Sequence, residues 1–208
     1  MAASVVQICN EALSYLGQAR INDIEDDTNE ARACNLHYET LRDRELEAFA
    51  WHHIISRQIL AAVTNTRTKE WKYSYAKPAL TTSIITVFDT ETGPTDPPHE
   101  YLLEGSTIWT NVKDANIVFA GTSTNPAAWS ALFRDAISWA LAARTAMSLT
   151  EDRDRAKDAR DQSLQTMSQA QAHDLRVRKE MQTYTRMSPA IMARLGLDNP
   201  GWVDLRAT

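Results

Sequence analysis

This sequence has little of what several protein classes require. Its 208 residues include two cysteines, Cys9 and Cys34, too few for the disulfide scaffold of a small secreted domain. Both stand among apolar neighbours on expected helices, so we predict buried free thiols. The six glycines are scattered and form no G-x-G-x-x-G or Walker-type phosphate loop.

Long apolar runs and basic excess are also absent. No stretch approaches the roughly 18 apolar residues of a membrane-spanning helix, and residues 1–4 do not resemble a signal peptide. We therefore expect synthesis in the cytoplasm and no membrane partner. The net charge of −5 disfavours a protein that coats nucleic acid. The 43% apolar and 24% charged residues are typical of a globular chain.

The first 64 residues carry helical signals. Apolar residues recur at helical spacing between a cap at Ser4 and a stop at Gly17. A second helix is predicted from about Thr28, with Asp27 or Thr28 as its cap, to about Phe49. The apolar segment 54–60 is expected to be helical or partly extended.

Between residues 65 and 125 the pattern changes to short strands. Rings at Trp71, Tyr73 and Tyr75 alternate with polar residues, and 83–88 is rich in β-branched residues. Further strands are predicted at 101–103, 107–110 and 116–120. Together these segments predict a small antiparallel β-subdomain.

Helix is predicted to return at Asn125 and Pro126, a favoured cap and first position. The helix that follows, to about Leu149, is the most hydrophobic and should lie at the centre of the bundle. A long polar helix is then expected over about 152–183. The predicted fold is mainly α: an antiparallel helical bundle (1–64 and 126–183) with a small inserted antiparallel β-subdomain (65–125) and an extended C-terminal arm (184–208).

Candidate chemical sites are weak. The pair His52 and His53 suggests metal binding, but adjacent residues of a helix point apart, whereas chelation favours i,i+4 spacing. Paired carboxylates such as Glu45 and Glu47 resemble a glycosidase pair, and Glu104 or Glu100 could act with them, yet an acidic chain offers such pairs by chance. No catalytic, cofactor-binding or metal-binding residue is predicted, and we expect no enzyme.

Two surfaces are candidates for binding a partner. The C-terminal arm is too interrupted by proline and glycine to build its own core, so its apolar residues are predicted to dock on a partner. A basic stretch near it is predicted to meet another subunit or passing DNA. The arm residues are Met187, Ile191, Met192, Leu195, Leu197 and Trp202, and the basic residues are Arg176, Arg178, Lys179 and Arg186.

The order of motifs resembles the head-to-tail adaptor (tail tubular protein A) family of short-tailed bacteriophages. That family opens with a helix ending in Leu-Gly, an Ile-x-x-Ile acidic loop and a helix followed by Trp. The matches are Leu16-Gly17, Ile21, Ile24, Cys34-Asn35, Tyr38, Arg42-Asp43, Trp51, Arg57 and Leu60-Ala61. The segments WKYSYAKP (71–78), YLLEGSTIWT (101–110) and NPAAWSALFRDAISWALA (125–142) follow in the family's order. The resemblance covers about residues 4 to 172 and stops before the arm.

The resemblance implies a structural virion protein at the head-tail interface. Copies would form a dodecameric ring that binds the portal protein on one side and the tail nozzle protein on the other. Double-stranded DNA would pass through the central channel, and the ring would help retain packaged DNA. Two alternatives stay open: a virion-associated muralytic hydrolase, and a nucleic-acid-binding factor of DNA packaging.

Overall fold

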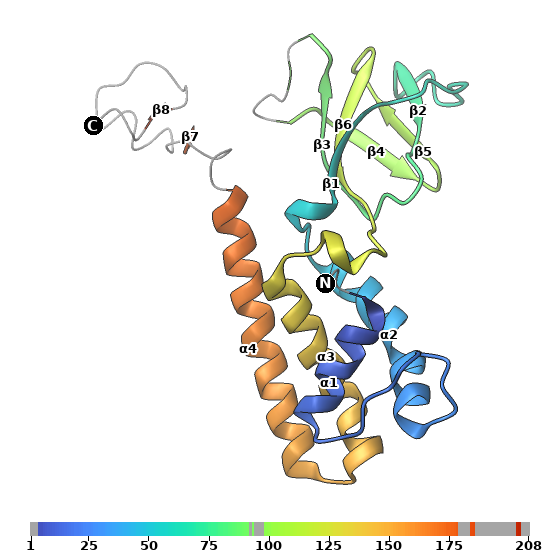
Figure 1. The fold of residues 1–208 in the computed structure, drawn as a ribbon. Coiled ribbons are helices and arrows are strands. Elements are labelled where there is room, and N and C mark those ends of the chain that lie inside the picture. The colour runs from blue at the N-terminus through green and yellow to red at the C-terminus, as the bar shows by residue number, and fades with distance from the viewer. Residues whose placement is uncertain (1–3, 92, 94–97, 179–183, 186–202, 205–208) are drawn as a thin grey trace.

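The computed structural model describes residues 4–91, 93, 98–178, 184–185 and 203–204. The chain forms a helical part and a β part that lie one beyond the other (Figure 1). Two short 3-10 helices, η1 (His52–Ile54) and η2 (Pro126–Ala128), stand where the chain passes between the parts. The helices of the helical part are α1 (Val5–Tyr15), α2 (Asn29–Ala48), α3 (Ala131–Thr150) and α4 (Arg153–Arg178).

Capping side chains place the starts of the first two helices where they were predicted. The hydroxyl of Ser4 accepts the backbone N–H of Gln7 at 3.2 Å, and that of Thr28 accepts the N–H of Ala31 at 3.1 Å. Gly17 ends the first helix with a φ of +67°, a conformation that glycine adopts without steric cost. Both helical predictions in this half are confirmed.

The predicted start of α3 is wrong by several residues. The Asn125 side chain does act as a cap, accepting the N–H of Ala127 at 3.0 Å, but the turn that it begins is only η2. The chain is extended at Trp129, and α3 begins after a second cap at Ser130. Asn125 and Ser130 are both suitable helix caps. The local sequence alone does not show which of them begins the long helix.

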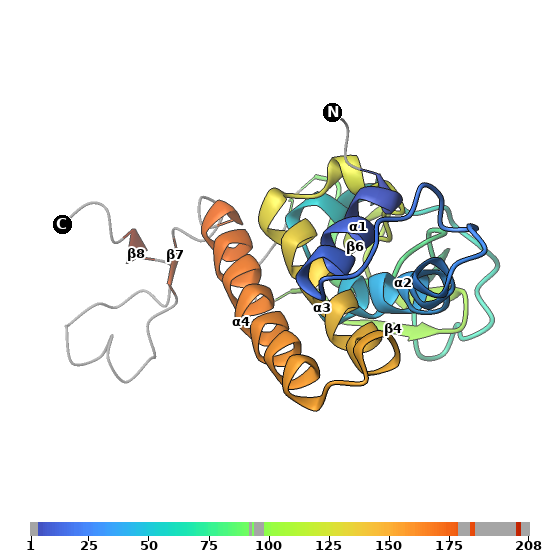
Figure 2. The ribbon, with the colours of Figure 1, turned by 60° about the horizontal axis from the view of Figure 1, so that its bottom comes forward.

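Helix α3 is the central helix, as its hydrophobicity predicts. It packs against α1, α2 and α4, and Figure 2 shows α4 on the side of α3 that faces away from α1 and α2. The buried core between the helices is almost wholly apolar. Its largest fully buried side chains are those of Ile8, Leu13, Leu16, Tyr38, Leu41, Leu46, Trp51, Phe133, Ile137 and Leu141.

The β part consists of two antiparallel sheets of three strands each, in the orders β1-β6-β3 and β2-β5-β4. Side chains from both sheets share one hydrophobic core, which includes Tyr75, Val87, Ile108 and Ile117. The chain after β1 also pairs with β2, through the bond from Val63 N–H to Ser74 O at 3.0 Å. The strands are β1 (Ile55–Ile59), β2 (Tyr73–Ala76), β3 (Ser83–Asp89), β4 (Tyr101–Glu104), β5 (Thr107–Thr110) and β6 (Ala115–Ala120).

This architecture corrects the predicted fold class. The described part of the chain is 49% helical and 19% strand, with two three-stranded sheets. It is therefore a mixed fold of helices and sheets and not a helical bundle with a small insertion. One reason is that Ile55–Ile59, counted with the helices, pairs along β6 as an extra strand. Another is that the sheets bury a core of their own. In the predicted arm, the structure describes only the short pair β7 (Tyr184–Thr185) and β8 (Val203–Asp204).

Candidate functional site

Trp51 fixes the point where the chain leaves the helical part. Its indole is 1% exposed, and Nε1 donates to the carbonyl oxygen of Glu45 at 2.9 Å. The ring packs against Phe49 and Phe133, with centroid distances of 4.7 and 4.3 Å. Because this anchor is buried, the next two residues are held at the boundary between helices and sheets.

His52 joins this boundary to the last turns of α4. Its backbone N–H donates to both carboxylate oxygens of Asp174 on α4, at 3.1 and 3.2 Å. Its Nδ1 atom also pairs with Asp174 Oδ1. The two residues are 122 positions apart in sequence. Their contact therefore attaches α4 to the segment where the chain passes from the helices to the sheets.

Asp174 is a buried charge, only 2% exposed, in the last turns of α4. Arg178 lies one turn later, with its Nε atom 3.1 Å from Asp174 Oδ2. The contact is an ion pair without hydrogen-bond geometry, since Nε has no hydrogen-bond partner among the described residues. The guanidinium also lies 5.0 Å from the centroid of the Phe49 ring, a cation–π contact.

His53 is the unusual member of the group. Its ring lies near those of Trp51 and Phe133, at 6.3 and 5.2 Å between centroids, and perpendicular to His52 at 5.5 Å. Neither ring nitrogen is exposed, and neither has a hydrogen-bond partner among the described residues. Burial, followed by repulsion from His52, lowers the pKa of His53 to about 4, against an opposing effect of Asp174. The ring is therefore neutral at neutral pH.

The geometry brings together three groups that ligate metals. One ligand atom from each of His52, His53 and Asp174 lies within 4.8 Å of the other two. Two imidazoles and a carboxylate are a donor set that suits Zn²⁺ and related transition metals. From the sequence, His52 and His53 are expected to point apart as neighbours on an α-helix. In the structure the two residues open a single 3-10 turn. No sequence signal identified Asp174, which stands in a polar helix where an aspartate normally faces water.

The predicted basic stretch is divided by the structure. Arg176 is exposed on α4, whereas Arg178 turns inward to Asp174 and Phe49. Lys179 and Arg186 lie outside the described residues, as do the predicted docking residues of the arm: Met187, Ile191, Met192, Leu195, Leu197 and Trp202.

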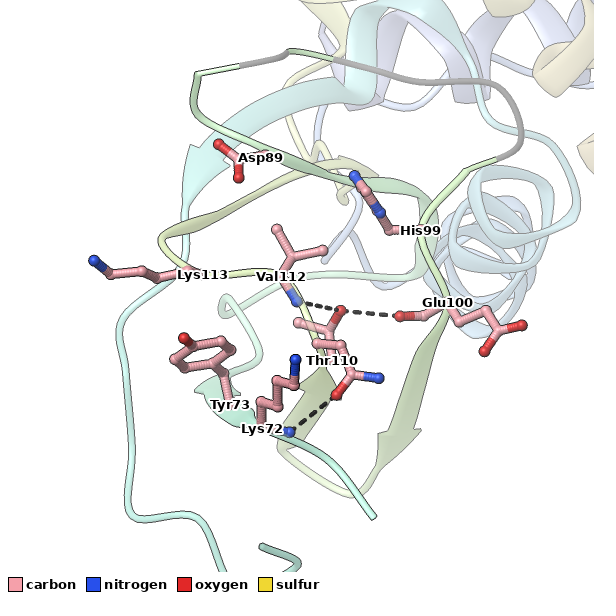
Figure 3. A pocket seen from close by; sticks show the side chains of 9 residues that line it. Lys72, Tyr73, Asp89, His99, Glu100, Thr110, Val112 and Lys113 are labelled. Atoms are coloured by element: carbon pink, nitrogen blue, oxygen red, sulfur yellow. Dashed lines mark hydrogen bonds between the residues drawn. The ribbon is translucent and has the colours of Figure 1, made fainter. Parts of the chain in front are cut away.

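The aromatic strand at 71–75 is part of the β core. Tyr75 is buried, and its hydroxyl donates to the carbonyl of Val112 at 3.0 Å. Tyr73 packs partly against the same core, so these two tyrosine rings are not an open platform for stacking bases, while Trp71 precedes β2 and is half-buried. A pocket of about 450 Å³ lies beside this strand (Figure 3). It mixes charges of both signs and is lined by Lys72, Tyr73, Asp89, His99, Glu100, Thr110, Asn111, Val112 and Lys113.

Two of the carboxylates considered for hydrolysis, Glu45 and Glu104, belong to different parts of the fold. Glu45 lies on α2 in the helical part, where Arg44 Nε donates to it at 2.9 Å. Glu104 ends β4 in the β part, where Arg67 donates to it at 2.6 Å. The elements that carry them, α2 and β4, lie in the helical part and in the β part respectively (Figure 1).

No protein-family model and no curated protein matches this chain. Among the described helices, none combines the length and the apolar character that crossing a membrane requires.

Proposed function

We propose that the protein is a structural ring subunit of a phage virion, a head-to-tail adaptor between portal protein and tail nozzle protein. The order of motifs from Leu16-Gly17 to the α3 segment supports this assignment. Under this proposal, the protein lies in the virion tail, around a channel through which double-stranded DNA passes. The net charge of −5 suits such a channel, because DNA phosphates are repelled rather than bound.

The exposed side of α4 is the structural observation that carries the proposal. This helix packs on α3 through a narrow stripe, with Ala159, Ala170 and Asp174 as its buried residues. Two large apolar side chains, Leu164 and Leu175, are 64% and 54% exposed. They stand about three turns apart on the same helix face. Apolar groups on an otherwise charged helix are expected at contacts between subunits, and a ring requires one such contact per subunit.

Binding to portal rings tests the proposal. We expect the full chain to saturate the portal ring of the same phage as a dodecamer, measured by native mass spectrometry. Leu164→Glu combined with Leu175→Glu should abolish the ring, because buried charges would oppose the lateral contact. The control combines Gln165→Glu with Gln169→Glu, which adds the same charge at exposed neighbouring positions and should keep the ring. No portal-bound protein at any ratio would contradict the proposal.

A further inference from the structure

We propose that His52, His53 and Asp174 bind a divalent transition-metal ion, with Zn²⁺ as the best match, and that the ion fastens the end of α4 to η1. The inference is independent of the proposed virion role. It rests on four features of the three residues: the spacing of their ligand atoms, the hydrogen bonds that each side chain makes, the ligand types, and their place in the fold.

The spacing needs only small adjustments. The three ligand atoms lie within 4.8 Å of one another. Ligand atoms around a tetrahedral Zn²⁺, each about 2.0–2.1 Å from the ion, are roughly 3.3 Å apart. Modest rotations of the side chains close this difference, and the rings of His52 and His53 already stand at 89° to each other.

Within the residues that the structure describes, one donor, His53, has no partner, and the other two are already oriented by their contacts. Both nitrogens of His53 are buried without a hydrogen-bond partner in the described part of the chain, a costly arrangement that a bound ion would relieve at one nitrogen. The carboxylate of Asp174 is held in place by the N–H of His52 and by Arg178. Arg178 approaches Oδ2, whereas Oδ1 accepts the His52 N–H and pairs with His52 Nδ1. An ion held between Oδ1 and Nδ1 would replace this direct pairing. Such outer contacts orient metal ligands in known sites.

The chemistry of the set selects the ion. Imidazole nitrogens favour Zn²⁺ and other first-row transition metals, whereas Mg²⁺ and Ca²⁺ prefer oxygen ligands. Three protein ligands leave a fourth position for water. The side chain of His52 is 34% exposed, so the group borders solvent and an ion can reach it.

The position of the group gives the ion a structural role. His52 and His53 belong to the passage from helices to sheets, and Asp174 stands one turn before the end of α4. An ion bound to all three residues would cross-link these segments.

Metal binding by the tag-free full chain tests the proposal. Zn²⁺ affinity is measured by competition with a chromogenic chelator, and Co²⁺ substitution reports coordination through its visible absorption. We expect one equivalent bound by the wild type, with Co²⁺ bands typical of four-coordination. His53→Gln and Asp174→Asn should each weaken binding at least about tenfold.

Two histidines outside the group provide matched controls. His173→Gln, next to Asp174 but exposed, and His37→Gln on α2 should both bind as the wild type does. If Asp174→Asn fails to fold, His53→Gln and the Co²⁺ spectrum of the wild type decide. Wild-type binding no tighter than that of His53→Gln, or an equal loss in His173→Gln, would overturn the proposal.

Discussion

The carboxylate of Asp174 accepts the backbone N–H of His52 at 3.1 Å, across 122 positions of sequence. Through this bond, the last helix holds the segment that leads from α2 into the sheets. The end of α4 and the start of η1 are thus attached to each other. The stability of the fold should therefore depend in part on this buried carboxylate.

Replacing this carboxylate should destabilise the protein. Asp174→Ala leaves the His52 N–H and the Arg178 guanidinium without their partner. We expect a loss of about 2 kcal/mol in the free energy of unfolding, less than for a fully buried pair because Arg178 and His52 are partly exposed. Urea denaturation measures it. Asp161→Ala, at an exposed position of the same helix, should change the free energy of unfolding by less than about 0.5 kcal/mol. If Asp174→Ala and Asp161→Ala changed it equally, the stabilising role of Asp174 would be refuted.

Gly17 is predicted to be intolerant of a side chain. Its φ is +67°, and an added Cβ would lie 3.4 Å from Arg155 Nη1, which donates to the carbonyl of Leu16 at 2.8 Å. Gly17→Ala should cost about 1 kcal/mol or more in thermal or urea unfolding. Gly17→Asn should cost less, because asparagine tolerates this backbone conformation. An alanine variant as stable as the wild type would contradict the geometry.

Two buried tyrosines should respond in opposite ways to loss of the hydroxyl. Tyr75 donates to Val112 O, so Tyr75→Phe should destabilise by roughly 1–3 kcal/mol because that carbonyl loses its partner. The hydroxyl of Tyr38 is buried without a partner in the described residues, so Tyr38→Phe should be neutral or stabilising. Paired urea titrations at pH 7 compare them. A larger loss for Tyr38→Phe than for Tyr75→Phe would contradict this assignment.

Tyr38 should also make the protein sensitive to alkali. Burial raises its pKa from 10.0 to about 12. Above pH 10 the unfolded chain loses this proton first, so the contribution to stability is complete below pH 10 and is lost as the pH rises through about 12. The stability of Tyr38→Phe should fall less steeply than that of the wild type over this range, as followed by chemical denaturation. Tyr101→Phe, at an exposed position, should keep the wild-type slope.

The element types in this fold were largely readable from sequence, because they depend on local patterns. Ser4 and Thr28 mark helix starts by their own hydrogen bonds, and the alternation around Tyr73 marks a strand. The balance of helices and sheets was not readable in the same way. Whether Ile55–Ile59 joins a helix or pairs with β6 depends on a partner some 60 residues later, and apolar character alone fits both.

The candidate site was only half visible in the sequence. His52 and His53 stand out as a pair, but the third member, Asp174, has no local signature. Its neighbours on α4 are polar and exposed, and an aspartate among them is normally solvated. Only the packing of α4 against η1 converts it into a buried partner of His52. The site depends on long-range contacts of this kind. The hydrophobic periodicity of the sequence contains no information about such contacts.

Electron microscopy of the purified chain mixed with portal rings of the same phage is the decisive test of the proposed adaptor role. We predict portal rings with an added layer of density on the tail-facing side, twelvefold symmetric around an open channel. That layer should disappear with Leu164→Glu combined with Leu175→Glu. Bare portal rings in the presence of excess folded wild-type protein would contradict the account.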